Sequence, residues 1–415
     1  MRKAILGGVV VAAAAVMALA YEHEDQGYVT PDKINVIETP RFYPVIDAHN
    51  HIGRPTPETY ELAIKAMDAA GMAVTVNLSG GNGADLDKHI ELGGKYPGRF
   101  VQFCNFNARG DEWKAPDIGE RIARVIQESH DKGAAGFGEA VKWALNGRIN
   151  WDDPRLEPMW SKLEELHMPI NWHVAAPSRF WRPESPYNTL EAPSYYKRLP
   201  LKQALLMQQE RVLERHPNLI VIAAHSNYLT DQIPLLVYRM ETYPNYNIDL
   251  SAVMEEWGRV PEEFAFICRE YPDRIFFGTD AGYSDRKVAA EGSMDNAVAH
   301  LKAFYVAHFL FLGTSQKMIP VPYNGNYGRY LIYWENGFTR YAHDGVALPN
   351  DVLEKIYYKN AERLFGLKVA DWKPATPVSF ETDFAPKNDN ARRQAPPAPE
   401  EPKAAPAAPG AKPAE

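Results

Sequence analysis

The sequence predicts an α/β protein folded as a (β/α)8 TIM barrel. Its 415 residues suit one large barrel with a trailing segment, or else two medium domains. Short apolar runs alternate with amphipathic helical stretches, which is the pattern of βαβ units around a parallel sheet. Histidine or acidic residues end several of these runs, at the edge where a barrel gathers its functional groups. Together these observations favour the single barrel.

The barrel needs eight strands, and the chain offers eight apolar runs. Amphipathic helices at 119–130, 156–166 and 262–271 fill some of the crossovers between them. Two connections are long, at 177–199 after the fifth strand and at 283–349 after the eighth, and long loops on this face are usually functional. The predicted strands are 45–49, 73–78, 100–106, 135–140, 169–174, 219–224, 246–250 and 274–278.

The composition is that of a soluble globular protein. Apolar residues make up 45% of the chain and charged residues 24%. The formal charge is -8 and no long block of Lys or Arg occurs, so no nucleic-acid partner is expected, while a homo-oligomer stays open. Only Cys104 and Cys268 are present, too few for a disulfide scaffold. We expect both to be buried, although a single bridge between them remains an alternative.

The chain begins with the features of a secretory signal peptide. Arg2 and Lys3 precede a continuous apolar run over residues 4–20, which ends in a small-x-small triplet at 18–20. An uncleaved membrane anchor is the alternative, but the run is short and rich in Ala and Gly. We therefore expect residues 1–20 to be removed. The mature protein would be periplasmic or extracellular and would have no stable membrane span.

The rest of the chain divides into three segments. We expect an N-terminal extension at 21–40, the barrel domain at 41–372 and a disordered tail at 373–415. The tail is rich in Pro and Ala and lacks a regular apolar period. Such a segment cannot bury enough apolar surface to offset its ordering entropy.

His49 and His51 stand at the end of the first predicted strand. Residues two apart on a strand point the same way, so both imidazoles can face one metal ion. Histidine is the commonest metal ligand near neutral pH. The pair alone is weak evidence, and its place at the end of an apolar strand strengthens it.

Polar residues at the ends of four further strands complete a metal-binding pattern. Imidazoles and carboxylates together suit zinc and related divalent ions. A lone histidine at a strand end is more often hydrogen-bonded than ligating, but the joint pattern is hard to explain by chance. The four are Glu139 on the fourth strand, His173 on the fifth, His225 on the sixth and Asp280 on the eighth.

This ordered set resembles that of the amidohydrolase superfamily. More narrowly, it is similar to the amidohydrolase-related (amidohydrolase 2) branch of metal-dependent TIM-barrel hydrolases and decarboxylases. The matching pattern is Asp47-x-His49-x-His51, followed in order by His173, His225 and Asp280. The segments 153–160 and 348–366 also resemble the branch. The resemblance spans roughly residues 41–368, and it is specific for the superfamily but weak for the substrate.

The resemblance implies a role for each residue of the set. His49, His51 and His173 would bind a divalent ion, and Asp280 would be a further ligand that handles the proton of a metal-bound water. His225 would either bind a second ion or polarise the carbonyl group of the substrate. The expected ion is zinc, with manganese or iron as alternatives, at one or two ions per chain.

Glu139 determines how many ions to expect. Two-metal members of the superfamily carry a bridging residue on the fourth strand, either a modified Lys or a Glu, and Glu139 could fill that role. The alternative is a carboxylate that orients a ligating histidine. Lys142 lies past the expected strand end, which argues against it as the bridge. By the same resemblance, Asp47 supports the turn of the first strand rather than binding metal.

The sequence departs from the branch at two places near the mouth of the expected pocket. Ser-Asn-Tyr at 226–228 follows His225, where the family often has an apolar residue and glycines. Ala-Gly-Tyr at 281–283 follows Asp280, where the family often has an aromatic residue and Pro. Both departures put in doubt the transfer of any particular substrate.

Candidate substrate-binding residues lie in two loops. The insertion after the fifth strand carries Arg179, Trp181 and Arg182, which could close as a lid over a ring or a carboxylate, or simply pack on the barrel. Arg54, just past His51, could hold a carboxylate or be a solvated surface arginine.

The remaining histidines receive no catalytic role. His89 is expected on a helix surface. His130, His167 and His216 lie near helix ends, where a cation suits the helix dipole. His300, His308 and His343 lie after the eighth strand and are expected to pack against the barrel.

Three functions remain open from the sequence. The first is a hydrolase that uses metal-activated water on a C–N, lactone or ester bond, and a bridging Glu139 favours it. The second is a decarboxylase of a small unsaturated or aromatic acid, favoured by a single ion and an arginine that holds a carboxylate. The third is a non-catalytic metal or ligand binder. Asp280 and His225 argue against the third, because a binder needs no proton acceptor beside an activated water.

Overall fold

The computed structural model describes residues 36–106, 108, 110–140, 148–176, 200–320 and 342–381. The predicted signal peptide, most of the extension and the tail beyond residue 381 lie outside these ranges. Lys142, Arg179, Trp181 and Arg182 also lie outside them. Within the described ranges, no helix has the length and apolar character needed to cross a membrane.

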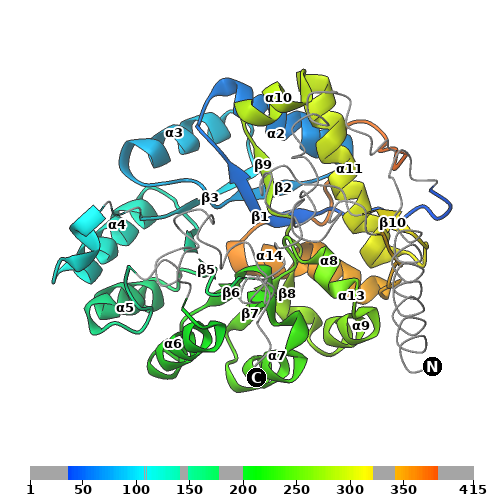
Figure 1. Ribbon diagram of the computed structural model, residues 1–415. Helices are drawn as coiled ribbons and strands as arrows, with labels where there is room; N and C mark the ends of the chain where they lie inside the picture. The colour runs from blue at the N-terminus through cyan, green and yellow to red at the C-terminus, as the bar shows by residue number, and fades with distance from the viewer. Residues whose placement is uncertain are drawn as a thin grey trace, which may run out of the picture.

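All neighbouring strands of the main sheet run parallel, in the order β8-β7-β6-β5-β4-β3-β2-β1-β9 (Figure 1). Each predicted strand appears, with boundaries that differ by a few residues from the prediction. Their bounds are β1 Ile46–Ile52, β2 Val74–Asn77, β3 Phe100–Cys104, β4 Gly136–Ala140, β5 Ile170–Trp172, β6 Val221–Ala223, β7 Tyr246–Asp249, β8 Ile275–Phe276 and β9 Ala281–Tyr283.

The chain segment that contains β8 and β9 closes the sheet into a ring. β8 pairs with β7, and β9, only a few residues further along the same run, pairs with β1. Between these two pairings the Ala48 amide donates to the Phe277 carbonyl and the Asp280 amide to the His49 carbonyl, both at 2.8 Å. The first and seventh strands are thereby joined, which confirms the predicted TIM barrel.

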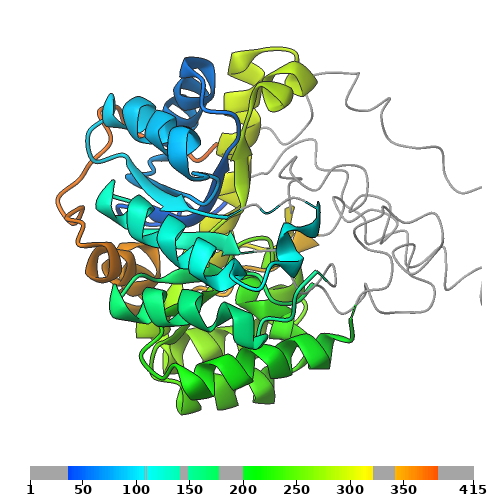
Figure 2. The same cartoon turned by 90° about the vertical axis from the view of Figure 1, so that its left-hand side faces the viewer.

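Helices surround the ring of strands, as Figures 1 and 2 show. They follow the strands in the βα rhythm expected of parallel crossovers. The helices are α2 Pro57–Ala70, α3 Gly83–Gly94, α4 Ile118–Asp131, α5 Glu157–Glu165, α6 Lys202–Arg215, α7 Ile233–Thr242, α8 Met254–Trp257, α9 Pro261–Glu270, α10 Asp285–Glu291, α11 Met294–Gly313, α13 Asn350–Glu354 and α14 Asn360–Phe365.

Local signals in the sequence begin and end the helices. Thr56 caps α2 by accepting from the Thr59 amide, and Thr59 accepts in return from the Thr56 amide. Pro57 occupies the first helical position, where its missing N–H is not needed. Gly71 then ends the helix in the left-handed conformation, with φ 74°.

The long helix α11 is buried over most of its circumference and packs against α2. Its buried side chains include Leu301, Phe304 and Leu310. A helix that is apolar on all sides must be covered on all sides. The helical stretch that carries His300 and His308, within the long connection after the eighth strand, is therefore part of the folded body.

Large aromatic rings fill the space between the barrel and α5. Trp172 points outward from β5, and its ring centroid lies 4.6 Å from that of Trp160 and 5.4 Å from that of Trp151. All three side chains are fully buried. Cys104 and Cys268 are buried as predicted, and both are free thiols rather than a bridge. Burial raises the pKa of Cys104 to about 12, so this thiol stays protonated.

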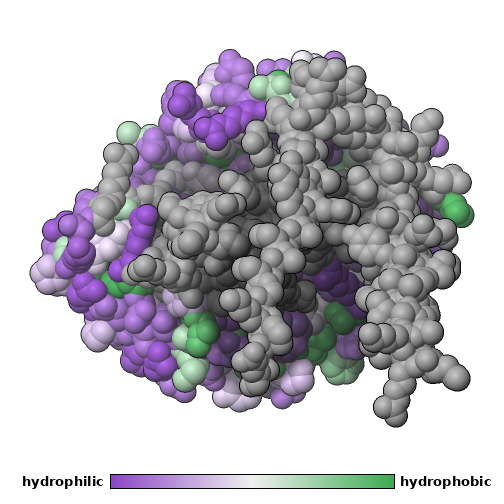
Figure 3. Space-filling view, in the orientation of Figure 1, coloured by the Kyte–Doolittle hydropathy of each residue, from purple (hydrophilic) through white to green (hydrophobic). Residues whose placement is uncertain are grey.

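The described part of the surface in Figure 3 is mostly hydrophilic, with small separate hydrophobic areas. Leu201, Met207, Tyr238 and Phe266 are among the exposed large hydrophobic residues. Single exposed apolar residues of this kind are normal on soluble proteins.

Candidate metal centre

The structure brings the predicted strand-end residues together at one end of the barrel. Successive rings make close contacts: the centroids of His49 and His51 lie 5.4 Å apart, those of His49 and His225 4.8 Å, and those of His173 and His225 4.6 Å. β1 carries the first two, and the other two directly follow β5 and β6. Four histidines from three separate parts of the sequence therefore form one cluster of imidazoles.

Glu139, at the end of β4, lies in the middle of this cluster. Its Oε1 atom is 2.5 Å from His173 Nδ1 and 3.2 Å from His225 Nε2. Its Oε2 atom is 3.4 Å from His51 Nε2, and Oε1 lies 4.0 Å from His49 Nε2. One carboxylate thus faces two pairs of histidines.

Asp280 lies beside the pair of histidines on β1. Its Oδ1 atom is 3.1 Å from His51 Nε2 and 3.7 Å from His49 Nε2. The residue sits between β8 and β9 in a left-handed conformation, with φ 60°, and is only 4% exposed. The geometry therefore divides the cluster into two half-sites. The first half-site contains His49, His51 and Asp280, the second contains His173 and His225, and Glu139 stands between them.

Three of the histidines have their outer ring nitrogen held by a hydrogen bond. His49 Nδ1 lies 2.8 Å from Asp249 Oδ2, His51 Nδ1 lies 2.8 Å from Ser79 Oγ, and His225 Nδ1 lies 2.9 Å from the Ser251 carbonyl oxygen. Metal-binding histidines are typically oriented in this way, with the other nitrogen left for the ion. In each of these three rings, Nε2 is the atom that faces the centre.

Asp249 is a functional residue that the sequence analysis missed. It ends β7 and is fully buried. Besides contacting His49, its carboxylate accepts from Asn171 Nδ2 at 2.9 Å, from the His225 amide at 2.9 Å and from Ser251 Oγ at 2.5 Å. It stands at a strand end like the other members of the set, and applying the same criterion to the seventh strand would have found it.

Asp47 supports the first strand, as the resemblance implied. Its carboxylate accepts from Thr279 Oγ1 at 2.5 Å, from Asn50 Nδ2 at 2.6 Å and from the His49 amide at 3.2 Å. These bonds tie β1 to the segment that precedes Asp280. Burial raises the pKa of Asp47 to about 6, although the hydrogen bonds oppose this.

The charges of the cluster shift the pKa values of its members. Burial alone would raise the pKa of Glu139, but His173, His225 and His51 outweigh it and hold that pKa well below its ordinary value. Burial opposes the rise in the pKa of His51, yet hydrogen bonds to Asp280 and Glu139 bring it to about 10. Burial likewise opposes a rise in the pKa of His225, but the hydrogen bond and charge of Glu139 bring it to about 9. The Glu139 carboxylate thus stays ionised and favours positive charge on the neighbouring histidines.

The donor set fits a divalent metal ion. His49 Nε2 is buried and makes no hydrogen bond within the described part of the chain, although it faces Glu139 and Asp280 at 4.0 and 3.7 Å. Two ligand atoms that share an ion at about 2 Å each lie roughly 3 to 4 Å from each other. His49 with His51 and Glu139, and Glu139 with His173 and His225, form two such groups. Nitrogen and oxygen donors of this kind suit zinc, manganese or iron.

The chain turns left-handed directly after β6. His225, Ser226, Asn227 and Tyr228 have φ values of 56°, 52°, 51° and 50°. For residues other than glycine this conformation costs roughly 1–2 kcal/mol each, so the surrounding structure must hold it.

Hydrogen bonds from neighbouring elements hold this turn. Ser226 Oγ donates to the Asp249 carbonyl at 2.9 Å. Asn227 Nδ2 donates to Gln209 Oε1 at 2.7 Å and to the Tyr246 hydroxyl at 2.8 Å. Ser226 and Asn227, where the sequence departs from the family pattern, therefore stabilise this turn through their side chains.

The predicted substrate-binding residues are not brought into the cluster by the described structure. Arg54 is exposed in the loop between β1 and α2, and its carbonyl accepts from Thr59 Oγ1 at 2.9 Å. Arg179, Trp181 and Arg182 lie outside the described residues, so the predicted lid remains a prediction.

The prediction for His89 was wrong. This residue is 1% exposed rather than on a helix surface. Its Nδ1 lies 2.9 Å from the Tyr60 hydroxyl and 3.2 Å from Asn77 Nδ2, and Asn77 also donates to Gln102. His89 therefore belongs to a buried polar network beneath α3, whereas the local sequence pattern had predicted a solvent-exposed position.

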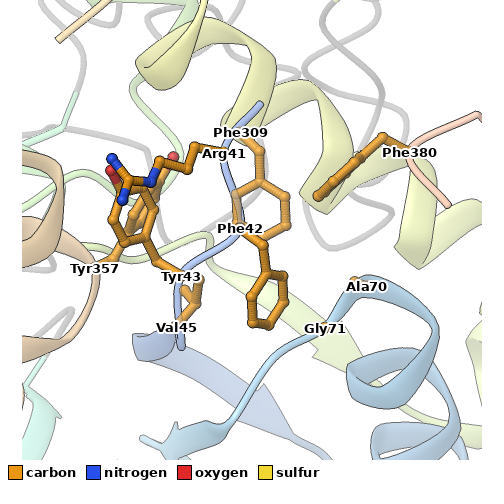
Figure 4. A pocket seen from close by; sticks show the side chains of 9 residues that line it. All are labelled: Arg41, Phe42, Tyr43, Val45, Ala70, Gly71, Phe309, Tyr357 and Phe380. Carbon is orange, nitrogen blue, oxygen red and sulfur yellow. The ribbon is translucent and has the colours of Figure 1, made fainter. Parts of the chain in front are cut away.

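A second pocket opens at the opposite end of the barrel, where β1 begins. Figure 4 shows Phe42, Tyr43 and Phe380 among the rings that line it, beside the Arg41 side chain and the glycine that ends α2. Its open space measures about 240 Å³. The residues that line it include no histidine and no acidic side chain. Among the described residues, the lining of this pocket therefore offers no set of imidazole and carboxylate ligands for a metal ion.

Comparisons with known proteins agree with this centre. The Amidohydrolase family matches residues 46–367, which cover every residue of the cluster. No curated protein matches the sequence.

Similar solved structures share the barrel but little sequence. An uncharacterised TIM-barrel protein from Bordetella bronchiseptica is 16% identical, with a TM-score of 0.46, over 78% of this chain and 98% of that chain. A 2,6-dihydroxybenzoate decarboxylase from Rhizobium is 17% identical, with a TM-score of 0.43, over 78% and 99%. Dihydroorotase from Saccharomyces cerevisiae is 12% identical, with a TM-score of 0.43, over 79% and 85%. Identities and TM-scores this low do not transfer a reaction.

The match of the family extends over more than half of the chain, and the cluster supplies the ligands that the chemistry of that family needs. The chain therefore belongs to the amidohydrolase family and is a metal-dependent hydrolase or decarboxylase.

Proposed function

We propose that this protein is a hydrolase that cleaves a C–N, lactone or ester bond in a small molecule, with two divalent ions in its centre. The position of Glu139 carries this proposal. Its carboxylate faces His51 at 3.4 Å on one side and His173 and His225 at 2.5 and 3.2 Å on the other. A carboxylate that orients a single ligand would not need to face both pairs.

Each residue then has a role in the proposed centre. His49, His51 and Asp280 would hold one ion, His173 and His225 would hold the other, and Glu139 would contribute to both. When bound, such ions lower the pKa of water to about 7 and polarise the bond under attack. Asp280 accepts the proton of the attacking water, since its carboxylate lies at the edge of the first half-site.

Zinc is the proposed ion. Nitrogen from four imidazoles and oxygen from two carboxylates suit it, while manganese and iron take similar ligands. Metal identity is tested by elemental analysis of protein purified without added metal. A chain that carries mostly manganese or iron would replace zinc in this proposal without changing the ligands.

A decarboxylase remains the competing function within the family. It would need an arginine that holds the carboxylate of the substrate. Arg54 is exposed within the described structure, and its guanidinium has no contact with the cluster. No described residue therefore favours decarboxylation over hydrolysis, whereas the position of Glu139 favours hydrolysis.

The test is a substrate screen with two readouts on one preparation. The signal-free, zinc-loaded protein is incubated with lactones, esters and amides while acid release is recorded. The same protein is incubated with aromatic and unsaturated acids while carbon dioxide release is recorded. Acid release that a chelator abolishes supports the proposal. Carbon dioxide release without hydrolysis of any compound would replace it with the decarboxylase.

We also propose that the protein is exported, because residues 1–20 have the order of a signal peptide. Expression of the full chain followed by N-terminal sequencing tests this. A mature protein that begins near Tyr21 and is released with the periplasmic or extracellular fraction is expected. A chain that keeps its N-terminus in the cytoplasm would contradict export.

A further inference from the structure

His173 differs from the other three histidines of the centre. In those three, a hydrogen bond holds the ring nitrogen that faces away from the centre. His173 uses Nδ1 to approach Glu139, at 2.5 Å. Within the described residues, its Nε2 atom has no hydrogen-bond partner, and the side chain is 12% exposed. A different contact must therefore fix the plane of this ring.

Tyr228 provides that contact. Its ring centroid lies 6.0 Å from that of His173 and 5.0 Å from that of His225, and it is tilted by 50° and 35° to them. The tyrosine is only 5% exposed. Its ring therefore packs against both histidines of the second half-site.

The left-handed turn at 225–228 determines where this ring lies. A right-handed or extended backbone after His225 would carry residue 228 in another direction. Lys202, which is 3% exposed, donates from Nζ to the Tyr228 carbonyl at 2.6 Å and to Asp231 Oδ1 at 3.1 Å. Asn227 anchors the middle of the turn on α6 and β7. The backbone of Tyr228 is therefore fixed from two sides.

We propose that Tyr228 is a positioning residue for the second half-site. For His173, packing against the Tyr228 ring replaces the hydrogen bond that orients each of the other three histidines. This inference rests on the proposed two-ion centre and adds to it a residue outside the ligand set. It also gives a reason for the Ser-Asn-Tyr sequence at 226–228, which a glycine-rich turn could not replace.

The test compares three variants of the signal-free protein, loaded with zinc and dialysed. Zinc per chain and the rate of zinc loss to a chelator are measured for Tyr228→Ala, for Tyr228→Phe and for Tyr238→Ala. Tyr238 is the matched control, because it is an exposed tyrosine on the neighbouring helix α7. Circular dichroism of the metal-free proteins checks that each is folded.

We expect Tyr228→Ala to lose one of two ions about ten-fold faster or more, since orienting contacts of ligands are typically worth 10–100-fold in metal affinity. Tyr228→Phe keeps the ring and should restore most of the lost affinity. Tyr238→Ala should behave like the parent. A merely structural role would lower thermal stability without a selective loss of one ion.

Two outcomes would overturn the inference. One is a folded Tyr228→Ala protein that keeps both ions as tightly as the parent. The other is equal loss of both ions, which would mean that the ring supports the whole centre. If Tyr228→Ala does not fold, Lys202→Met removes the donor to the Tyr228 carbonyl, together with the bond to Asp231, and it should weaken the same single ion. A parent protein that never holds two ions would instead refute the proposed function.

Discussion

His173 is the residue whose removal most cleanly separates metal binding from folding. Its side chain reaches solvent, with 12% exposed, whereas His49 and His225 are fully buried. His173→Ala should abolish turnover, by more than about 100-fold, because the ion that activates the substrate loses a ligand. The thermal midpoint of the metal-free protein should change little.

Activity, zinc content and thermal unfolding of His173→Ala are compared with those of His130→Ala, an exposed histidine at the end of α4. The control should match the parent in all three. Full activity in His173→Ala would remove this residue from the centre.

Asp249 should be nearly as important as a ligand. Its carboxylate binds His49 Nδ1 and the His225 amide, and the charge on His49 helps to lower the pKa of Asp249 to about 2, against the effect of burial. Asp249→Asn keeps the shape but weakens these bonds. Zinc affinity should fall by about 10–100-fold, as is typical for carboxylates behind metal-binding histidines.

Zinc titration against a competing chelator measures this effect. Asp87→Asn, which alters an exposed carboxylate paired with Lys132, is the control. Unchanged zinc affinity in Asp249→Asn would show that hydrogen bonds from Ser251 alone orient the two histidines.

At the residue scale, the sequence predicted the cluster because parallel strands end at one face. His49, His173 and Asp280 needed only that rule to be placed together. Which nitrogen of each imidazole faces the centre was not predictable, since it depends on partners such as Ser79 and Ser251 that come from other strands. His89 was misplaced for the same reason, because its hydrogen-bond partners Tyr60 and Asn77 lie on two other elements, α2 and β2.

Strand β4 carries a backbone position that admits only glycine. Gly138 has φ +127°, and a Cβ atom there would lie 2.4 Å from the Asn171 carbonyl oxygen on β5. Gly138→Ala should therefore push β4 away from β5 and move Glu139. We expect a loss of stability of about 1–3 kcal/mol, beyond the cost of the φ angle, and fewer ions per chain.

Gly133→Ala is the matched control for the backbone angle. Gly133 has φ +101°, but a Cβ atom there meets nothing within 4 Å. Its variant should lose some stability and keep its zinc. Chemical denaturation and elemental analysis of both proteins distinguish the two effects, and equal zinc content in both would contradict the role of close packing at Gly138.

At the element scale, strand existence was easier to predict than strand ends. The first strand was expected to end at His49, yet β1 continues to Ile52 because its last residues pair with β9. That partner lies about 230 residues away in sequence, and no local pattern could reveal it. β9 itself was not predicted, since three residues after Asp280 are too few to show an alternating pattern.

The whole molecule should lose stability in mild acid. Burial lowers the pKa of His89, His308 and His343 to about 4, whereas the unfolded chain protonates its histidines near pH 6.5. Below pH 6.5 the unfolded state therefore binds more protons than the folded state. Stability should fall between pH 6.5 and 4, by at most about 3 kcal/mol for each histidine.

His308→Phe isolates one of these contributions. The ring lies between Phe277 and Phe304 on the buried side of α11, so a phenylalanine suits the site. The free energy of unfolding is measured between pH 7 and 4 for the parent and the variant. The variant should lose less stability over this range, and parallel curves would show that His308 does not titrate between these states.

The two ends of the chain lie outside the residues that the structure describes. The family match, residues 46–367, lies within the predicted domain at 41–372. The disordered tail was expected from residue 373, yet Phe380 packs against Phe309 and the Glu381 carbonyl accepts from Lys302 Nζ at 2.9 Å. The signal peptide and the tail beyond residue 381 were predicted from composition and lie outside the described residues. Their boundaries and the export of the protein therefore stay predictions.

The number of metal ions per chain is the most direct measure of the proposed centre. Elemental analysis of the purified, signal-free protein, prepared without chelator, should find about two divalent ions per chain. Glu139→Gln should reduce this number to about one, because the bridging charge is lost. A parent protein with one ion that is unaffected by Glu139→Gln would contradict the bridge, and a protein that takes up no metal would contradict the centre itself.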